Sequence, residues 1–136
     1  MNYLLDTNVV SELFKKSPNP HLVRWLGDTR QDSLFLSVLT IGEIRKGVET
    51  MMQGSRKASL VRFLDKDVQE QFEQRILPVD VAVAEAWGTL EARAGRPLST
   101  VDALLAATAM VHNLTLVTRN VRDFTFTTVN VLNPWS

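Results

Sequence analysis

The amino-acid sequence predicts an α/β fold in which a parallel central sheet is flanked by helices. Short apolar runs typical of buried strands alternate with longer amphipathic stretches typical of helices. Strands separated by helices pair in parallel, because each helix carries the chain back to the start of the next strand. The length of 136 residues is usual for one domain, and no linker, repeat or low-complexity tract divides it. We therefore expect residues 1–136 to form a single domain.

Five strands are expected, and all of them are short and apolar. They cover residues 2–5, 34–38, 76–79, 114–117 and 129–132. The internal ones are continuous hydrophobic runs without polar alternation, which indicates strands that helices cover on both faces. The last run is expected as an edge strand.

Six helices are expected between these strands. They cover residues 9–15, 21–28, 39–52, 60–72, 81–94 and a segment from Ser99 or Thr100 to about His112. Breaks are predicted at 17–20, 54–55, 95–97 and Asn113, where proline, glycine or asparagine ends a helix. Residues 103–111 are apolar nearly all round, so we expect this helix to be deeply buried.

The composition excludes several kinds of chemistry. The sequence has no cysteine, which excludes thiol catalysis, zinc ribbons and iron–sulfur clusters. Fifteen basic residues balance fifteen acidic ones, which argues against a bulk polyanion-binding domain but is compatible with a nuclease whose acidic centre offsets a basic rim. Neither a signal peptide nor an apolar segment of the ~20 residues that span a bilayer is visible. We expect a cytoplasmic protein that does not contact a membrane.

Four acidic residues lie just after predicted strands or in the first turns of predicted helices. Asp6 directly follows the first strand, and Glu43 lies early in the helix after the second. Asp102 lies in the first turn of the buried helix, and Asp123 lies in the loop after the strand 114–117. Ligands of parallel sheets bind beyond the carboxyl ends of the strands. We therefore expect these four carboxylates to meet at one end of the sheet.

Converging carboxylates predict a bound cation, because they repel one another and lose solvation without one. Mg²⁺ prefers oxygen ligands and needs few protein carboxylates. One or two such ions lower the pKa of a bound water and stabilise the attacking and leaving oxygens during displacement at phosphorus. This chemistry needs no histidine, cysteine or serine nucleophile, which suits a chain whose only histidines are His21 and His112. The sequence thus predicts metal-dependent hydrolysis of a phosphodiester.

Each of these carboxylates also has a structural interpretation. Asp6 and Asp102 can each cap the helix beside which it lies. Glu43 can form a surface ion pair with a lysine such as Lys46, and Asp123 can be an ordinary loop residue.

Four polar side chains at strand ends are candidates for a supporting role. They are Thr7, Asn8, Ser37 and Thr118. Each can orient a carboxylate or a water, or can instead bind a local backbone donor.

Several segments of the sequence resemble PIN-domain ribonucleases. They are Leu5-Asp6-Thr7-Asn8, Ser37 to Ile44, Asp102 to Ala109, and Leu116 to Asn120 followed by Asp123-Phe124. Their order and spacing cover essentially the whole chain and are most similar to VapC and FitB toxins of type II toxin–antitoxin pairs. The resemblance implies a Rossmann-like parallel sheet and an endoribonuclease that depends on Mg²⁺, for which Mn²⁺ can substitute.

The same resemblance implies several partners. These are a VapB-like antitoxin that inhibits the enzyme near its acidic site, an RNA substrate and a second copy of the chain in a homodimer. Operator DNA is contacted only through the antitoxin.

Carried over residue by residue, the resemblance implies that Asp6, Glu43 and Asp102 are catalytic metal ligands. Many relatives carry an aspartate where this sequence has Asn120, so the fourth position lies open between Asn120 and Asp123. We take Asp123 as the fourth catalytic ligand and Asn120 as its support.

Basic residues beside these motifs are expected to contact RNA phosphates. They are Arg45, Lys46, Arg119 and Arg122. A solvated helix face explains Arg45 and Lys46 equally well. Met51, Met52 and Phe63 are candidates for an antitoxin groove or a dimer contact, although core packing also explains them.

Two other functions remain open from the sequence. A catalytically weak PIN-like module that binds RNA or protein would keep the fold, and Asn120 in place of an acid motivates this alternative. A phosphatase of the same sheet class commonly carries a second aspartate two residues after the first, and here that position is Asn8.

Overall fold

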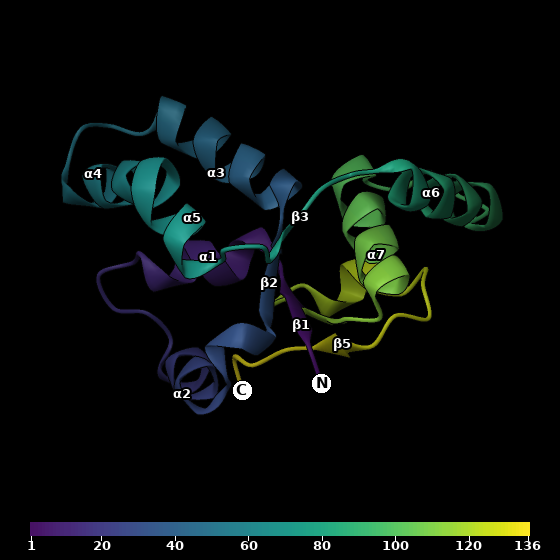
Figure 1. Ribbon diagram of the computed structural model, residues 1–136, viewed down its shortest axis with the longest axis horizontal. Helices are drawn as coiled ribbons and strands as arrows, with labels where there is room; N and C mark the ends of the chain where they lie inside the picture. The colour runs from purple at the N-terminus through teal and green to yellow at the C-terminus, as the bar shows by residue number, and fades with distance from the viewer.

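The computed structural model describes all 136 residues and contains a five-stranded sheet whose neighbouring strands are all parallel (Figure 1). The strands are β1 (Tyr3–Leu5), β2 (Leu34–Ser37), β3 (Ile76–Leu77), β4 (Thr115–Val117) and β5 (Val131–Leu132). They lie in the order β3-β2-β1-β4-β5, with the first strand at the centre. The predicted α/β fold with a parallel sheet is confirmed, and β5 lies at an edge as expected.

Helices cover both faces of this sheet. They are α1 (Thr7–Leu13), α2 (Pro20–Asp28), α3 (Val38–Thr50), α4 (Ser55–Arg62), α5 (Val68–Gln71), α6 (Val81–Arg93) and α7 (Thr100–His112), with the short turns η1 (Gln31–Ser33), η2 (Phe63–Asp67) and η3 (Val121–Phe124). Figure 1 places α6 and α7 on one side of the strands and α1, α3, α4 and α5 on the other. None of the helices is long and apolar enough to cross a membrane.

The sheet divides the hydrophobic core into two clusters. Leu5 of β1 and Val117 of β4 pack with the side chains of α1 to α5, whereas Leu4 and Leu116 pack with those of α7. Neighbouring residues on one strand therefore belong to opposite clusters, because side chains alternate between the faces of a sheet. Both faces are apolar, which explains why the strands show no polar alternation in the sequence.

Polar residues at the ends of strands begin the helices that follow. Asp6 comes directly after β1, and its Oδ1 accepts a 2.7 Å hydrogen bond from the amide of Thr7 at the start of α1. Ser37 ends β2, and its Oγ accepts a 3.0 Å bond from the amide of Leu39 in α3. These caps satisfy amides that the first turn of a helix leaves without partners. They also fix the first turns of α1 and α3 at the carboxyl edge of the sheet.

Two predicted helices differ clearly from the observed ones. The helix predicted over 9–15 spans Thr7–Leu13, because the Asp6 cap starts it two residues earlier. The helix predicted over 60–72 begins at Ser55 and contains the π-helical turn η2. Its first turn is polar and exposed, so hydrophobic periodicity does not reveal it.

The burial expected for the last helix is also only partly correct. Residues Ala103 and Leu105 of α7 are fully buried, but Met110 and Val111 near its end are 43% and 39% exposed. The cluster covers α7 as far as Ala109, and the last residues of the helix project past it. It ends at Asn113, which adopts the left-handed conformation with φ of 54°, as its break signal predicts.

Candidate active site

The centre of the carboxyl edge lies where β1 and β4 end side by side. Leu5 pairs with Val117 in the register of these two strands, so Asp6 and Thr118 are the next residues on adjacent strands. The amide of Asp6 donates a 2.9 Å hydrogen bond to the carbonyl of Val117, which continues the ladder by one step. Two segments far apart in the sequence thereby present polar side chains at the same point.

Asp6 is held by side chains from both segments. Its Oδ2 accepts a 2.8 Å hydrogen bond from Oγ1 of Thr118 and a 3.3 Å bond from Nδ2 of Asn8. The residue is only 7% exposed, and burial raises the pKa of its carboxyl group. The bonds from Thr118 and Thr7 oppose that rise, whereas the negative charges of Glu43 and Asp123 add to it. Asp6 therefore acts both as a helix cap and as the centre of an acidic group.

Glu43 reaches the same edge from α3. Its Oε1 accepts a 2.5 Å hydrogen bond from Oγ1 of Thr7, the residue next to Asp6. The surface ion pair with Lys46 that the sequence allowed is not formed. Thr40 of α3 is fully buried and its Oγ1 lies 3.4 Å from Oγ1 of Thr7. The only sequence signal for Thr40 is its position one turn before Glu43, so the pattern does not single it out.

Asp102 lies in the first turn of α7 and is partly buried. Burial, followed by the charges of Asp6, Asp123 and Glu43, raises its pKa from 3.8 to about 6. A 3.5 Å hydrogen bond from its amide to Oγ of Ser99 caps the helix, which agrees with the structural interpretation of this motif. The negative charges of the three other acidic residues therefore all act on Asp102. The four acidic residues thus share one electrostatic site, which we call the acidic edge.

Asp123 and Asn120, the two candidates for the fourth ligand, lie differently. Asp123 is in the exposed turn η3, and its charge contributes to the raised pKa of both Asp6 and Asp102. Asn120 donates its amide to Oγ1 of Thr118 over 3.0 Å, and its carbonyl accepts the amide of Asp123. The charge of Asp123 therefore acts on the other members of the acidic edge, whereas the hydrogen bonds of the Asn120 backbone shape the loop that carries Asp123.

The chemistry of the acidic edge fits a hard divalent cation. All four of its side chains are carboxylates, the ligands that Mg²⁺ prefers in proteins. The raised pKa values of Asp6 and Asp102 record repulsion and lost solvation that a cation would relieve. No three acidic or histidine side chains stand close enough together to form a preformed metal site. The carboxylates must therefore turn toward an ion in order to bind it.

The basic residues expected to contact RNA fall into two groups. Nη2 of Arg45 forms a 2.5 Å ion pair with Oδ1 of Asp65 in η2. Lys46, Arg119 and Arg122 are exposed and form no ion pair. Arg119 and Arg122 lie in the loop after β4, which carries Thr118 and Asp123.

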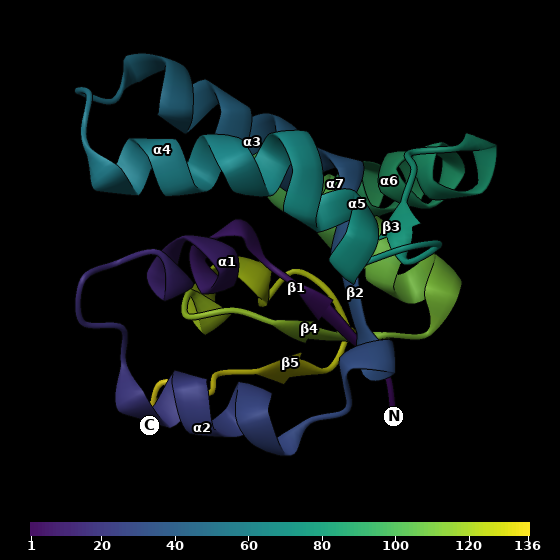
Figure 2. The same ribbon diagram turned by 60° about the vertical axis from the view of Figure 1, so that its left-hand side comes forward.

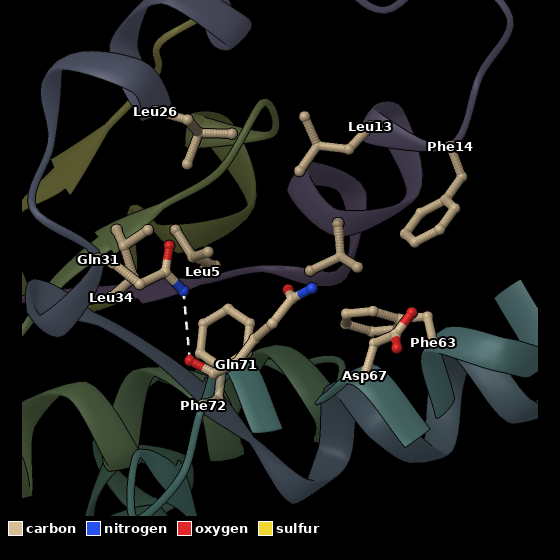
Figure 3. A pocket seen from close by; sticks show the side chains of 11 residues that line it. Leu5, Leu13, Phe14, Leu26, Gln31, Leu34, Phe63, Asp67, Gln71 and Phe72 are labelled. Atoms are coloured by element: carbon tan, nitrogen blue, oxygen red, sulfur yellow. Dashed lines mark hydrogen bonds between the residues drawn. The ribbon is translucent and has the colours of Figure 1, made fainter. Parts of the chain in front are cut away.

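An apolar hollow of about 330 Å³ lies on the side of α1 that faces α2 and η2 (Figure 3). Eight of its eleven lining residues are hydrophobic, and Leu13, Leu26 and Phe63 line it from α1, α2 and η2. Of the three residues considered for a partner surface, only Phe63 lines this hollow. Met51 packs against the core, and Met52 is 91% exposed.

Comparison with known proteins places this geometry in one family. A model of the PIN domain matches residues 3–128 of the chain. The chain is 37% identical to the Toxin FitB of Neisseria gonorrhoeae over 97% of both proteins, and 32% identical to the VapC ribonuclease Y4jK of Sinorhizobium fredii over 97% of this chain and 96% of that one. A solved structure of FitAB bound to an IR36 DNA fragment superposes with a TM-score of 0.89 at 35% identity, covering 98% of this chain and 96% of that one. The chain therefore belongs to the PIN-domain family, and within it to the VapC and FitB type of toxin ribonucleases.

Proposed function

We propose that this chain is an Mg²⁺-dependent endoribonuclease that acts as the toxin of a type II toxin–antitoxin pair. The observation that carries the proposal is the acidic edge. There, burial and the negative charges of three other carboxylates raise the pKa of Asp102 to about 6. Burial and mutual repulsion make the ionised forms of these carboxylates unfavourable, and a bound cation would relieve both effects. The names of the similar proteins, a toxin and a ribonuclease, supply the class of reaction.

In this proposal Asp6 and Asp102 contact the metal, and Glu43 and Asp123 complete the site. The bound ion would supply a water of lowered pKa and would neutralise charge on the phosphate. Thr118 and Asn8 keep Oδ2 of Asp6 in a fixed orientation through their hydrogen bonds. Thr7 holds Glu43 in the same way, and Ser37 and Asn120 support the neighbouring backbone.

Positive charge for the substrate comes from the loop that follows β4. We assign phosphate contacts to Arg119 and Arg122, which are exposed beside the acidic edge. Lys46 is exposed on α3 three residues after Glu43 and completes this set. Arg45 can join it only by leaving its ion pair with Asp65. Contacts of this kind strengthen binding and make it depend on salt.

A cleavage assay with a fluorescent structured RNA tests the proposed reaction. The purified protein should cut the RNA with Mg²⁺ or Mn²⁺ and should not cut it in EDTA. The variant Asp6→Asn should abolish cleavage while the fold, measured by circular dichroism, is kept.

Asp80→Asn is the matched control for this substitution. Asp80 also caps a helix, because its Oδ1 accepts a 3.0 Å bond from the amide of Val83 in α6, and asparagine caps equally well. This variant should cleave like the wild type. Full activity of Asp6→Asn would contradict the assignment of the site. Cleavage by neither protein, with no Asp6-dependent heat when Mn²⁺ is titrated, would favour the alternative of a PIN-like binding module.

The proposed partner is a VapB-like antitoxin that binds the apolar hollow beside α1. A groove lined by leucine and phenylalanine fits the apolar face of a peptide or helix. The similar FitAB structure contains DNA, and we assign DNA contacts of the present complex to the antitoxin. We further propose that the chain is a cytoplasmic homodimer, which light scattering of the free protein tests.

Leu13→Glu tests the antitoxin assignment. Leu13 lines the hollow but is 41% exposed, so a charge should be tolerated in the fold and should weaken the complex with the co-expressed antitoxin. Val23→Glu is the control, since Val23 is 45% exposed on α2 and does not line the hollow. Native mass spectrometry measures the fraction of complex. An undiminished complex with Leu13→Glu would exclude the hollow as the binding site.

A further inference from the structure

Glu12 is a buried carboxylate that the acidic edge does not use. It is 6% exposed, and no other acidic residue except Asp6 is buried. Glu12 lies near the end of α1, the helix that Asp6 begins. A buried charge is costly unless it is paired and hydrogen-bonded, so its partners indicate why it is there.

The two oxygens of Glu12 have different partners. Oε2 accepts a 2.9 Å hydrogen bond from the amide of Asn19, which fixes the end of the loop between α1 and α2. Oε1 forms a 2.8 Å ion pair with Nζ of Lys15, whose side chain is 45% exposed. One oxygen therefore holds the backbone, and the other holds a cation at the surface.

The same face of α1 also carries Asn8, four residues before Glu12 and thus one turn away. Oδ1 of Asn8 accepts a 3.2 Å hydrogen bond from the amide of Arg119. The side chains of Glu12, Lys15 and Arg119 line a common hollow of about 400 Å³. Figure 2 shows the loop after α1 on the same side of the molecule as the C-terminal end, and Trp135 completes this hollow. Asn8 thus fixes the backbone of Arg119, and Glu12 and Arg119 line the same hollow.

The charges in this hollow do not cancel. Lys15, by its hydrogen bond, is the main cause that lowers the pKa of Glu12, and the charge of Arg119 adds to that effect. Two cations thus surround one carboxylate, and an excess positive charge remains at the surface. Asn8, which anchors the backbone of Arg119, also donates to Asp6, so Arg119 starts next to the acidic edge and the hollow that it shares with Lys15 adjoins this edge. A phosphate group is the anion that an RNA strand would offer there.

We propose that Glu12 is a positioning residue for RNA binding, which holds the ammonium of Lys15 and the guanidinium of Arg119 side by side to bind one phosphate of the strand. The inference rests on the proposed ribonuclease function and adds Lys15 and Glu12 to its substrate surface. Glu12 does not touch the reacting atoms. Its removal should therefore weaken binding of RNA and leave the chemical step intact.

Glu12→Gln is the variant that tests this role. Glutamine keeps an oxygen to accept the amide of Asn19 but loses the charge that pairs with Lys15 and attracts Arg119. Fluorescence anisotropy with a short labelled single-stranded RNA in EDTA measures the dissociation constant without cleavage. We expect a rise of about tenfold and a shallower dependence on salt. With Mg²⁺, KM should rise by a similar factor while kcat is unchanged.

Arg119→Met and the double variant Glu12→Gln/Arg119→Met test whether Glu12 acts by positioning Arg119 or only by holding the loop between α1 and α2. If Glu12 acts through Arg119, Glu12→Gln should have little further effect on RNA affinity once Arg119 is replaced. Asp32→Asn is the control, because Asp32 forms an exposed ion pair with Arg30 in the η1 region, before the start of β2 and so at the opposite edge of the sheet. It should bind RNA like the wild type.

The outcomes distinguish this inference from the proposed function. An unchanged or lower dissociation constant for Glu12→Gln, with a wild type that binds and cleaves RNA, overturns the role of Glu12 alone. The role of Glu12 is also overturned if the effects of Glu12→Gln and Arg119→Met on the free energy of RNA binding are additive. A wild type that neither binds nor cleaves RNA overturns the ribonuclease function as well. If Glu12→Gln does not fold, Lys15→Met and Arg119→Met must each weaken RNA binding, or the inference fails.

Discussion

Oγ1 of Thr118 donates a 2.8 Å hydrogen bond to Oδ2 of Asp6, although 112 residues separate them in the sequence. Thr118 is fully buried, and its hydroxyl also accepts bonds from Nδ2 of Asn8 and the amide of Asn120. One hydroxyl thus links the first strand, the first helix and the loop after β4. If Asp6 binds a metal as proposed, Thr118 is the group that orients this ligand, and loss of such a group typically lowers metal affinity or activity about 10- to 100-fold.

Replacing Thr118 by valine should lower activity through the orientation of Asp6. Valine has nearly the same shape but cannot donate to Oδ2, so we expect kcat/KM for RNA cleavage to fall about 10- to 100-fold. Loss of this bond also removes one of the causes that lower the pKa of Asp6. Thr118→Ser restores the hydroxyl and should recover most of the activity. Equal activity of the valine and serine variants would show that the bond has no role in catalysis.

Asp102→Asn should stabilise the metal-free protein near neutral pH. The folded pKa of Asp102 is about 6 against an ordinary value of 3.8, so its contribution favours the fold below 3.8 and is lost as the pH rises through about 6. Asparagine cannot ionise and avoids this loss. Thermal melts in EDTA should therefore give the variant the higher Tm near pH 7, but no advantage below pH 3.8.

With Mg²⁺ in place of EDTA, the wild type should have a higher Tm than Asp102→Asn. A cation that binds the ionised carboxylates stabilises the folded wild type in proportion to its occupancy. The variant Asp102→Asn lacks one proposed ligand, so Mg²⁺ should raise its Tm by less. Equal gains on addition of Mg²⁺ would argue against Asp102 as a ligand.

Leu105→Ala should destabilise the face of the sheet that α7 covers. Leu105 is fully buried in the cluster with Leu4 and Leu116. Its truncation to alanine leaves a cavity and should lower the free energy of unfolding by about 2–5 kcal/mol. Met110→Ala on the same helix should cost much less, because Met110 is 43% exposed. Urea unfolding measures both free energies. Similar losses for the two variants would contradict the observed orientation of α7.

Gln74→Gly should stabilise the turn between α5 and β3. Gln74 is exposed and has a φ of 62°, a left-handed conformation that costs most residues about 1 kcal/mol and glycine almost nothing. The gain is reduced by the greater freedom of glycine in the unfolded chain. Gln53→Gly, where φ is not positive, is the control and should not be stabilising. Thermal unfolding compares the two variants, and a lower Tm for Gln74→Gly than for the wild type would be the contrary result.

Much of the fold follows from local pattern, because each strand and helix carries its own signal. The buried strands are continuous apolar runs, and Asn113 ends α7 as its type predicts. The start of α4 at Ser55 was missed because its first turn is exposed and has no apolar periodicity. The exposure of Met110 depends on where α7 leaves the core, which the residues of the helix alone do not determine.

The acidic edge was predictable in outline for a different reason. Asp6 directly follows a central strand, and the geometry of parallel sheets brings such positions together. The contacts that orient its members were not predictable. The bond from Thr7 to Glu43 joins residues 36 apart, and the bond from the amide of Arg119 to Asn8 spans 111 residues. Short-range pattern contains no information on pairs of this kind, so the same residues fitted local capping equally well.

The central place of β1 has a consequence for the newly made chain. β1 is synthesised first, but its neighbour β4 and the turn with Asp123 come near the end, so a nascent chain cannot assemble the carboxylates until most of it has left the ribosome. Even a chain that stops after α7 has Asp6, Glu43 and Asp102 but lacks Thr118. If the proposed toxin acts through this edge, translation products that stop before β4 lack Thr118 and Asp123 and should be harmless to the cell.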